Sequence, residues 1–380
     1  MTNDTDKRPD IAVIGTNPVK LWGLDTQERT RRIAAAAALG WQDSEAPAPP
    51  CVLVNAGFAF DPGWLRHIAA HPGKALSNGG VPVLAYARTE DEARAVAGAM
   101  RNKTPLPATS SLDVTAYESG PVLENKELRK RETPFLDRLD ADTVRPLERA
   151  SYFGAYKGVT DILTKYLWPE WALVITRIAA RLGITPNMVT AVGAILCVLA
   201  TFAFGYGHYW AGMAMGLVFM VLDTVDGKLA RCTITSSWWG NVFDHGIDLV
   251  HPPFWWYAWA VGLAYWGLAL SPEQFWFAMI AIVGGYVVQR FVEGAFISSF
   301  GMHVHVWEKF DSQFRLITAR RNPNMIILFA ATAFGRPDLG LIAVAWWTLI
   351  SLLVHAVRLG QAYLQRARGA NIRSWLQAPA

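Results

Sequence analysis

Four carboxylates lie close together between Asp223 and Asp248, in a stretch that reads DTVDGKLARCTITSSWWGNVFDHGID. Asp223 and Asp226 are three residues apart, so they share one face of a helix. Asp244 and Asp248 are four residues apart and share a face of the next helix. The stretch lies between apolar segments long enough to cross a bilayer. Carboxylates at membrane depth are costly and by default mark a functional site.

Two glycines, Gly227 and Gly240, accompany the carboxylates and allow close approach of helices or a ligand. Four like charges directed at one point repel one another, so a hard divalent cation is the natural counter-charge. We expect Mg²⁺ or Mn²⁺, with two ions in the site. Such ions at a membrane surface suggest phosphoryl chemistry, and Arg231 is placed to hold a diphosphate. The alternative from another class is a carboxylate-lined cation transporter.

Membrane helices must position these carboxylates. Up to about residue 165 the chain is mixed and charged, whereas from about 187 it is dominated by long apolar runs. The expected fold is mainly α, a six-transmembrane-helix bundle preceded by a small cytoplasmic α/β domain. The six spans are expected at about 188–206, 209–230, 240–268, 273–299, 322–335 and 338–360. The fifth is short for a hydrocarbon core of about 30 Å.

The loops between the spans differ in charge. Those around 207–208 and 269–272 carry no Lys or Arg, whereas the loops on the other side are basic. The positive-inside rule then places both termini and the four carboxylates on the cytoplasmic side of an inner or plasma membrane. The net charge of +4 is too small to argue for a nucleic-acid partner.

Residues 165–181 combine an apolar face with basic residues. Trp168 and Trp171 are interspersed with Lys165, Arg177 and Arg181. This pattern predicts an amphipathic helix in the membrane interface. A core helix of the soluble domain is the alternative.

The first part of the chain alternates strand and helix patterns, which predicts a small α/β domain over residues 1–120. Strands are expected at 11–15, 51–54 and 81–87, and helices at 26–39, 61–71 and 89–100. A charged linker with one or two surface helices is expected over 121–164, followed by the membrane domain over 165–380. The α/β layout resembles the first half of a sugar-nucleotidyltransferase domain. That domain's glycine-rich loop and metal-binding Asp are unmatched, and Asn55 stands where an acid is expected, which implies a degenerate domain.

The carboxylate stretch has the pattern D-x2-D-G-x2-A-R-x8-G-x3-D-x3-D. Its fixed positions are Asp223, Asp226, Gly227, Ala230, Arg231, Gly240, Asp244 and Asp248. This pattern resembles the signature of the CDP-alcohol phosphotransferase (CDP-alcohol phosphatidyltransferase) family, and the resemblance extends over roughly 165–380. Members of that family move the substituted phosphate of a CDP-linked alcohol to a second alcohol and release CMP. The resemblance therefore implies an enzyme of phospholipid biosynthesis.

The resemblance also implies roles for individual residues. Asp223, Asp226 and Asp244 would bind metal, and Asp248 would be a further ligand. Asp248 would also be the base that deprotonates the acceptor hydroxyl. The CDP moiety would contact Gly227, Arg231, Ser237, Ile184, Thr185, Pro186 and Asn187. Asn187 could equally cap the first span.

The sequence does not fix which donor and acceptor alcohols the enzyme joins. The donor is CDP-diacylglycerol or a small CDP-alcohol, and the acceptors considered include an inositol or inositol phosphate type polyol. Arg290 and Glu293 form an intramembrane ion pair, or Arg290 lines the acceptor pocket. Arg320 and Arg321 are ordinary loop charges, or they bind an acidic acceptor. The resemblance further implies a homodimer in contact with membrane lipid.

Overall fold

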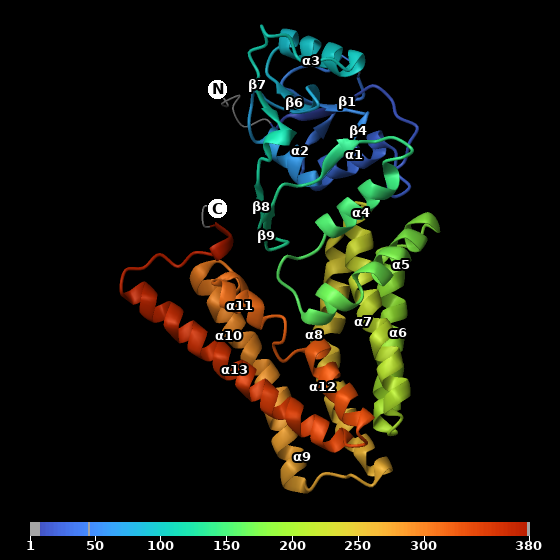
Figure 1. Cartoon of the computed structure of the whole chain (residues 1–380), viewed down its shortest axis with the longest axis vertical. Coiled ribbons are helices and arrows are strands. Elements are labelled where there is room, and N and C mark those ends of the chain that lie inside the picture. The colour runs from blue at the N-terminus through green and yellow to red at the C-terminus, as the bar shows by residue number, and fades with distance from the viewer. Residues whose placement is uncertain (1–7, 45, 378–380) are drawn as a thin grey trace.

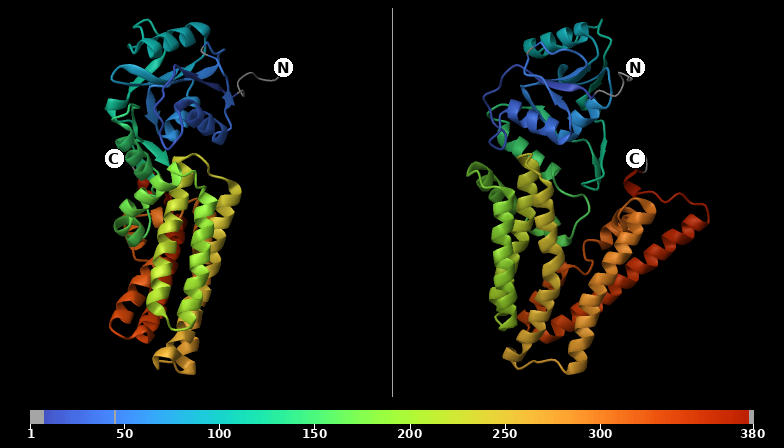
Figure 2. Two further views of the ribbon diagram at one scale, coloured as in Figure 1. Left: turned by 90° about the vertical axis from the view of Figure 1, so that its right-hand side faces the viewer. Right: turned by 180° about the vertical axis from the view of Figure 1, so that it is seen from behind.

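The protein is described by a computed structural model that covers residues 8–44 and 46–377. It is mainly helical, and an α/β domain sits on one end of the helical domain (Figures 1 and 2). The predicted small α/β domain and the mainly helical class are thus both confirmed. The outermost predicted domain limits, residues 1 and 380, lie outside the described residues.

The α/β domain is built on a mixed six-stranded sheet in the order β2-β1-β3-β6-β5-β7. Its strands are β1 (Asp10–Ile14), β2 (Gly40–Trp41), β3 (Cys51–Asn55), β5 (Lys74–Asn78), β6 (Val81–Ala87) and β7 (Asp113–Ala116). β1 runs parallel to both of its neighbours, whereas β6 is antiparallel to β3 and β5. Successive side chains of β3 are buried on opposite faces of the sheet, because the strand period is two.

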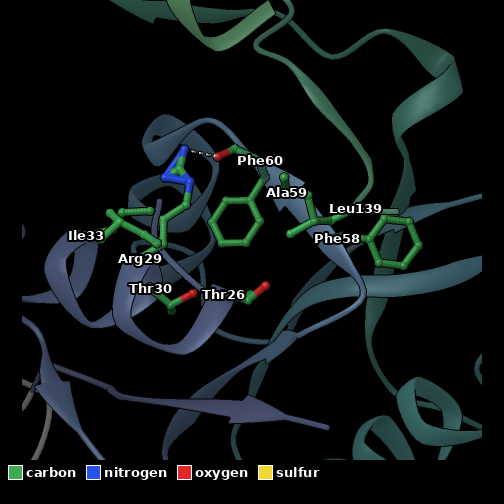
Figure 3. A pocket seen from close by; sticks show the side chains of 9 residues that line it. Thr26, Arg29, Thr30, Ile33, Phe58, Ala59, Phe60 and Leu139 are labelled. Carbon is green, nitrogen blue, oxygen red and sulfur yellow. Dashed lines mark hydrogen bonds between the residues drawn. The ribbon is translucent and has the colours of Figure 1, made fainter. Parts of the chain in front are cut away.

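Three helices cover the two faces of this sheet. They are α1 (Thr26–Ala36), α2 (Pro62–Ala69) and α3 (Glu90–Asn102). Ile33 of α1 and Trp64 of α2 are buried on one face, and Val96 of α3 on the other. Thr89 accepts a hydrogen bond from the Glu92 backbone N–H and starts α3 as predicted. The pocket in Figure 3, beside α1, has a volume of about 10 Å³, which is room for one water molecule and not for a nucleotide.

The segment predicted as a linker is folded against the α/β domain. It contains β8 (Leu123–Asn125), β9 (Lys130–Glu132), β10 (Leu136–Arg138) and α4 (Val144–Gly154). β8 and β9 form a hairpin, and β10 pairs antiparallel with β4 (Phe58–Phe60). The α/β domain therefore continues past residue 120 by at least one strand.

The helical domain has helices in each region predicted as a span. Its main helices are α5 (Pro169–Arg181), α6 (Pro186–Gly205), α7 (Tyr209–Cys232), α8 (Trp238–Gly262), α9 (Pro272–Met279), α10 (Gly285–Phe300), α11 (Lys309–Phe314), α12 (Arg321–Ala333) and α13 (Pro337–Ala367). Short 3-10 helices lie at Tyr117–Ser119, Leu263–Trp266, Val304–Val306 and Trp375–Gln377. π-helical segments lie at Leu163–Leu167 and at Ile280–Gly284, which joins α9 to α10. Three stretches are long and apolar enough to cross a membrane: Pro186–Gly205, Pro272–Phe300 and Pro337–Ala367.

Two features of these helices bear on the site. α8 contains Pro252 and Pro253 just after its second carboxylate. Pro253 has no N–H for the Leu249 carbonyl, which instead accepts a hydrogen bond from the Tyr286 hydroxyl of α10 at 3.2 Å. This bond ties the carboxylate-bearing part of α8 to the opposite side of the domain.

The α/β domain contacts the connection between α7 and α8. Arg32 Nη1 donates to the Thr233 carbonyl at 3.1 Å. Ile234 has a φ of 52° and packs against the core of the α/β domain. The non-helical turn in the middle of the carboxylate stretch is thus held from outside the helical domain.

Candidate active site

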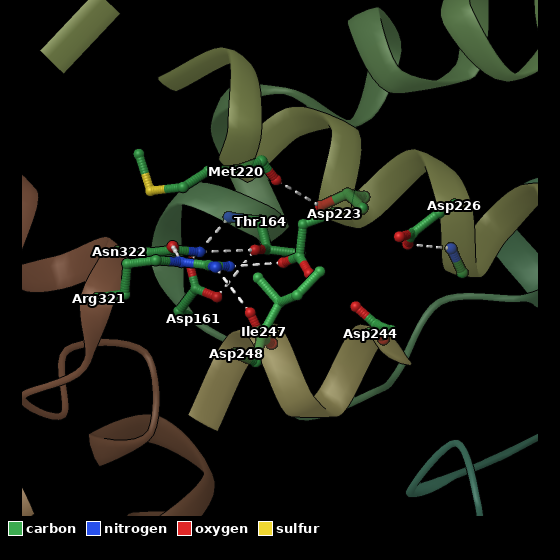
Figure 4. A network of polar contacts seen from close by, with 12 residues as sticks. Asp161, Thr164, Met220, Asp223, Asp226, Asp244, Ile247, Asp248, Arg321 and Asn322 are labelled. Atoms are coloured by element: carbon green, nitrogen blue, oxygen red, sulfur yellow. Dashed lines mark hydrogen bonds and ion pairs between the residues drawn. The ribbon is translucent and has the colours of Figure 1, made fainter. Parts of the chain in front are cut away.

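Three of the four carboxylates converge. One carboxylate oxygen from each of Asp223, Asp226 and Asp244 lies within 4.8 Å of the other two. Asp226 is buried, and Asp223 and Asp244 are half-buried. Figure 4 shows the pair on α7 facing the pair on α8. Carboxylate oxygens at this separation form a donor set that fits a hard divalent cation.

Asp248 has a different partner, Arg321 at the start of α12. Arg321 Nη1 lies 2.7 Å from Asp248 Oδ1, and its Nη2 lies 2.5 Å from Asp223 Oδ2 (Figure 4). One guanidinium therefore bridges the two helices and offsets part of the charge of both carboxylates. The sequence predicts Arg321 to be an ordinary loop charge or a ligand of an acidic acceptor, and it does not indicate this bridge.

Asp226 is fixed by two short hydrogen bonds. The Thr190 hydroxyl of α6 and the backbone N–H of Gly227 each donate to its carboxylate at 2.5 Å. Nearby, Trp168 Nε1 donates to the Thr224 hydroxyl at 3.1 Å, so the start of α5 also braces this part of α7. Neither Thr190 nor Trp168 stood out in the sequence as a partner of the site.

The carboxylates line a cavity of about 1020 Å³. It is also lined by five residues predicted to contact the nucleotide: Pro186, Asn187, Gly227, Arg231 and Ser237. Ile184 and Thr185 are not among the described lining residues. Thr185 instead caps α6 by accepting from the Met188 N–H, and Ile184 packs against the core.

Gly240 lies beside two of the predicted nucleotide contacts, Asn187 and Ser237. A Cβ at Gly240 would lie 2.8 Å from Asn187 Oδ1 and 3.0 Å from the Ser237 hydroxyl. Ser237 also caps α8 by accepting from the Gly240 N–H. The glycine thus brings an amide, a hydroxyl and two helix ends to one wall of the cavity.

Two basic residues of α7, Lys228 and Arg231, reach the C-terminal end of α4. Arg231 Nε donates to the Ala155 carbonyl at 3.1 Å, as does Lys228 Nζ at 2.9 Å. Lys157 also lines the cavity, and burial, together with the charges of Arg129 and Arg231, lowers its pKa. These positive charges lie where a diphosphate beside the carboxylates would be stabilised.

A second ionic cluster lines the same cavity. Arg290 Nη1 lies 3.1 Å from Glu293 Oε2, so the predicted intramembrane ion pair is present. Glu293 also pairs with Arg320 and with His305, whose Nε2 lies 3.3 Å from Glu293 Oε1. The ion pair of Arg290 is therefore confirmed, and Arg290 also lines the cavity. Its role toward an acceptor stays a prediction.

Comparison with known proteins identifies the helical region that carries the carboxylates. Residues 183–319 match the family model described as CDP-alcohol phosphatidyltransferase. This region is a CDP-alcohol phosphatidyltransferase domain. The transferase domain contains all four carboxylates and the whole of the motif predicted from the sequence.

Two curated relatives show the extent of the similarity. Cholinephosphotransferase 1 of Xenopus laevis is 32% identical over 123 residues, which cover 30% of this chain and 29% of that protein. The archaetidylinositol phosphate synthase of Pyrococcus horikoshii is 28% identical over 185 residues, covering 48% of this chain and 88% of that one. The chain thus spans less than a third of the length of the first relative and most of the second.

Among solved structures, the chain is similar over half of its length to the phosphatidylinositol phosphate synthase PgsA1 of Mycobacterium tuberculosis in complex with manganese and citrate. The TM-score is 0.40 at 18% identity, covering 50% of this chain and 88% of that one.

Proposed function

We propose that the chain is an integral membrane CDP-alcohol phosphotransferase that acts in phospholipid biosynthesis. The observation that carries the proposal is the convergence of Asp223, Asp226 and Asp244 on the wall of a large cavity. This cluster lies inside the matched transferase domain. Its donor is CDP-diacylglycerol or a small CDP-alcohol, and its acceptor is a second alcohol.

The divalent ions, Mg²⁺ or Mn²⁺, would be held by Asp223, Asp226 and Asp244, with Asp248 as a further ligand. We propose two ions. When bound, they neutralise phosphate oxygens and the charge that develops during displacement at phosphorus. Thr190 and the Gly227 N–H orient the Asp226 carboxylate for this task.

Asp248 is the proposed base. The acceptor hydroxyl oxygen forms a bond to the phosphorus that carries the donor alcohol, and the bond from that phosphorus to the oxygen of CMP breaks. The hydroxyl proton passes to the Asp248 carboxylate, and CMP leaves with the bonding electrons. Asp248 is the most exposed of the two carboxylates that Arg321 bridges, so it can face an acceptor that enters the cavity.

The nucleotide would lie against the α6–α8 wall. Gly227 permits close approach of the CDP moiety, Arg231 faces its diphosphate, and Ser237 and Asn187 offer polar groups beside Gly240. Pro186 lies on the same wall. We propose that Ile184 and Thr185 contribute to nucleotide binding indirectly, by fixing the start of α6.

The membrane arrangement is proposed from the helices and the loop charges. Six spans would be formed by α6, α7, α8, α9 to α10, α12 and α13, with both termini and the active site on the cytoplasmic side. α12 has 13 residues and a length of about 20 Å, so it would span only with its flanking residues. α5 leaves Trp171, Val174 and Ile178 about half exposed, which suits the membrane interface. A homodimer is also proposed.

For the α/β domain we propose a structural role without nucleotidyl transfer. Asn55 is buried, and its side chain donates to the Pro82 carbonyl and accepts from the Gly57 N–H. An amide in these contacts supplies no anionic metal ligand. The full-length protein should therefore form no CDP-alcohol from CTP and a phosphorylated alcohol.

The proposed function is tested by CMP release from purified full-length protein. CDP-diacylglycerol and a small CDP-alcohol are each supplied with a panel of alcohols, with Mg²⁺ and with EDTA, and products are identified by mass spectrometry. We expect CMP and a new phosphodiester in Mg²⁺ and neither in EDTA. Folded protein that releases no metal-dependent CMP with any pair would refute the enzyme and favour a cation transporter.

A further inference from the structure

The cavity has a second charged region, remote in sequence from the carboxylates. We call it the cationic subsite, and its residues are Arg129, Arg290, Arg315 and Arg320. Arg290 comes from α10, while Arg315 and Arg320 precede α12. Arg129 comes from the turn of the β8–β9 hairpin, which lies outside the matched residues 183–319.

The described residues compensate the charges of this subsite only in part, through Glu293 and, near Arg315, through Asp161. Glu293 is shared by Arg290 and Arg320, so one carboxylate serves two guanidiniums. Among the described residues, no group accepts a hydrogen bond from Arg315 Nε or Nη1, both of which are buried. The Nε atoms of Arg290 and Arg320 are likewise buried without an acceptor in the described part of the chain. Buried charged donors without acceptors are costly, and an anion would relieve that cost.

The pKa values of Arg315 and Arg129, which lie outside the proposed spans, are both lowered in this cluster. Burial lowers the pKa of Arg315 to about 9, with the charge of Arg320 as the next cause. Burial and the charge of Arg320 also lower the pKa of Arg129. These guanidiniums therefore lie within one another's field inside a single cavity.

Arg129 lies in a turn that is ordered by hydrogen bonds. It has a φ of 52°, and the preceding Leu128 N–H donates to Asn125 Oδ1 at 2.9 Å. The Gly158 N–H donates to the Leu128 carbonyl at 2.8 Å, and a Cβ at Gly158 would lie 2.6 Å from the Arg129 carbonyl oxygen. Only a glycine fits at this contact, so the hairpin turn is fastened to the chain that leads into the helical domain.

We propose that the cationic subsite binds the phosphate of a phosphorylated alcohol acceptor, and that Arg129 of the preceding segment completes it. The inference rests on the proposed function and names the class of its acceptor. Guanidinium groups suit a phosphate because each can present two parallel N–H donors. The donor's diphosphate is the other source of such an anion. It is better placed at Arg231, beside the carboxylates and the predicted nucleotide contacts.

The first test is steady-state kinetics of the full-length enzyme with CDP-diacylglycerol. Inositol phosphate and glycerol phosphate should support CMP release at least tenfold better than inositol, glycerol or choline. Arg129→Gln should raise the KM for the phosphorylated acceptor about tenfold and leave the KM for the donor unchanged. Arg138→Gln, an exposed arginine on β10, is the matched control and should change neither. Equal use of an uncharged alcohol, or an effect of Arg129→Gln on the donor KM alone, would overturn the proposal.

A binding measurement separates this inference from the proposed function. Inositol phosphate should raise the Tm of the wild-type protein without donor present, and raise that of Arg129→Gln by less. Such a shift without CMP release would refute the proposed function and leave the subsite standing. CMP release without any shift, and with no preference for phosphorylated acceptors, would refute the subsite alone.

Discussion

The two ends of the cavity carry charges of opposite sign. At one end Arg321 bridges two of the four aspartates, Asp223 and Asp248. At the other end Glu293 pairs with two of the four arginines, Arg290 and Arg320. The aspartates lie on α7 and α8, whereas the arginines come from α10, the segment before α12 and the β8–β9 hairpin. Both ends open into the same volume of about 1020 Å³.

Each end of the cavity therefore carries an excess of charge that its ion pairs only partly offset, negative at one end and positive at the other. A structural ion pair tends to be matched, because a buried unpaired charge costs several kcal/mol. An excess of carboxylates fits a divalent cation, and an excess of guanidiniums fits a phosphate. A transferase that moves the substituted phosphate of a CDP-alcohol to a phosphorylated alcohol, with release of CMP, would use both ends at once.

The largest expected effect at the acidic end comes from Asp248→Asn. The amide keeps the shape of the side chain and cannot accept the acceptor's proton, so CMP release should fall by about a thousandfold. Donor binding should persist, because the predicted nucleotide contacts are untouched. Rates of CMP release and equilibrium binding of CDP-diacylglycerol measure the two separately. Near-normal turnover would remove Asp248 as the base.

The bridge between the acidic helices is tested by Arg321→Lys. An ammonium keeps the charge and cannot bridge two carboxylates with a planar fork, so CMP release should fall by about tenfold to a hundredfold. Arg336→Lys is the matched control, since Arg336 pairs with Asp338 at 2.7 Å and does not line the cavity. If both variants lose activity equally, the bridge has no special role.

The nucleotide wall is tested by Gly240→Ala. The added methyl would press on Asn187 and Ser237, so the donor KM should rise about tenfold while the acceptor KM stays constant. Gly246→Ala lies on the same helix with nothing within 4 Å of the added Cβ, and it should behave as wild type. An unchanged donor KM in Gly240→Ala would argue against this wall as the nucleotide site.

A substitution in the α/β domain, far from both ends of the cavity, should affect stability and leave activity unchanged. Hydrogen bonding from Arg88 lowers the pKa of Glu92 to about 2, against an ordinary value of 4.5. Ionised Glu92 therefore stabilises the α/β domain above about pH 4.5, and this contribution is lost as the pH falls through about 2. Glu92→Gln should lower the Tm at pH 7, and the gap to wild type should shrink below pH 4.5, with CMP release unaffected. The exposed neighbour Glu90, changed to Gln, is the control.

Most of the carboxylate cluster could be predicted because its four residues lie close together in the sequence. The spacings of Asp223 to Asp226 and of Asp244 to Asp248 place each pair on one helix face, and the sequence between them is short enough to make the helices neighbours. The strands and helices of the α/β domain also follow from local apolar patterns. β5 was missed because its sequence, KALSN, lacks the alternation and β-branched residues of a strand.

The partners of these residues could not be predicted in the same way. Arg321 lies 98 residues after Asp223, and its bridge depends on how α12 packs against α7. Arg129 lies in a charged stretch that reads as a solvated linker, and only the folding of the hairpin turns it into the cavity. The sequence suggests an acceptor role for Arg290 and Arg320, but their grouping with Arg129 and Arg315 depends on tertiary packing.

The most direct measurement of the central claim is Mn²⁺ binding by electron paramagnetic resonance, made alongside CMP release on the same samples. We compare wild type with Asp226→Asn, whose side chain keeps its shape and loses its charge. The account predicts that wild type binds Mn²⁺ and releases CMP in proportion to the ion bound, and that the variant loses both. Undiminished CMP release from EDTA-treated wild type, or from the variant, would contradict it.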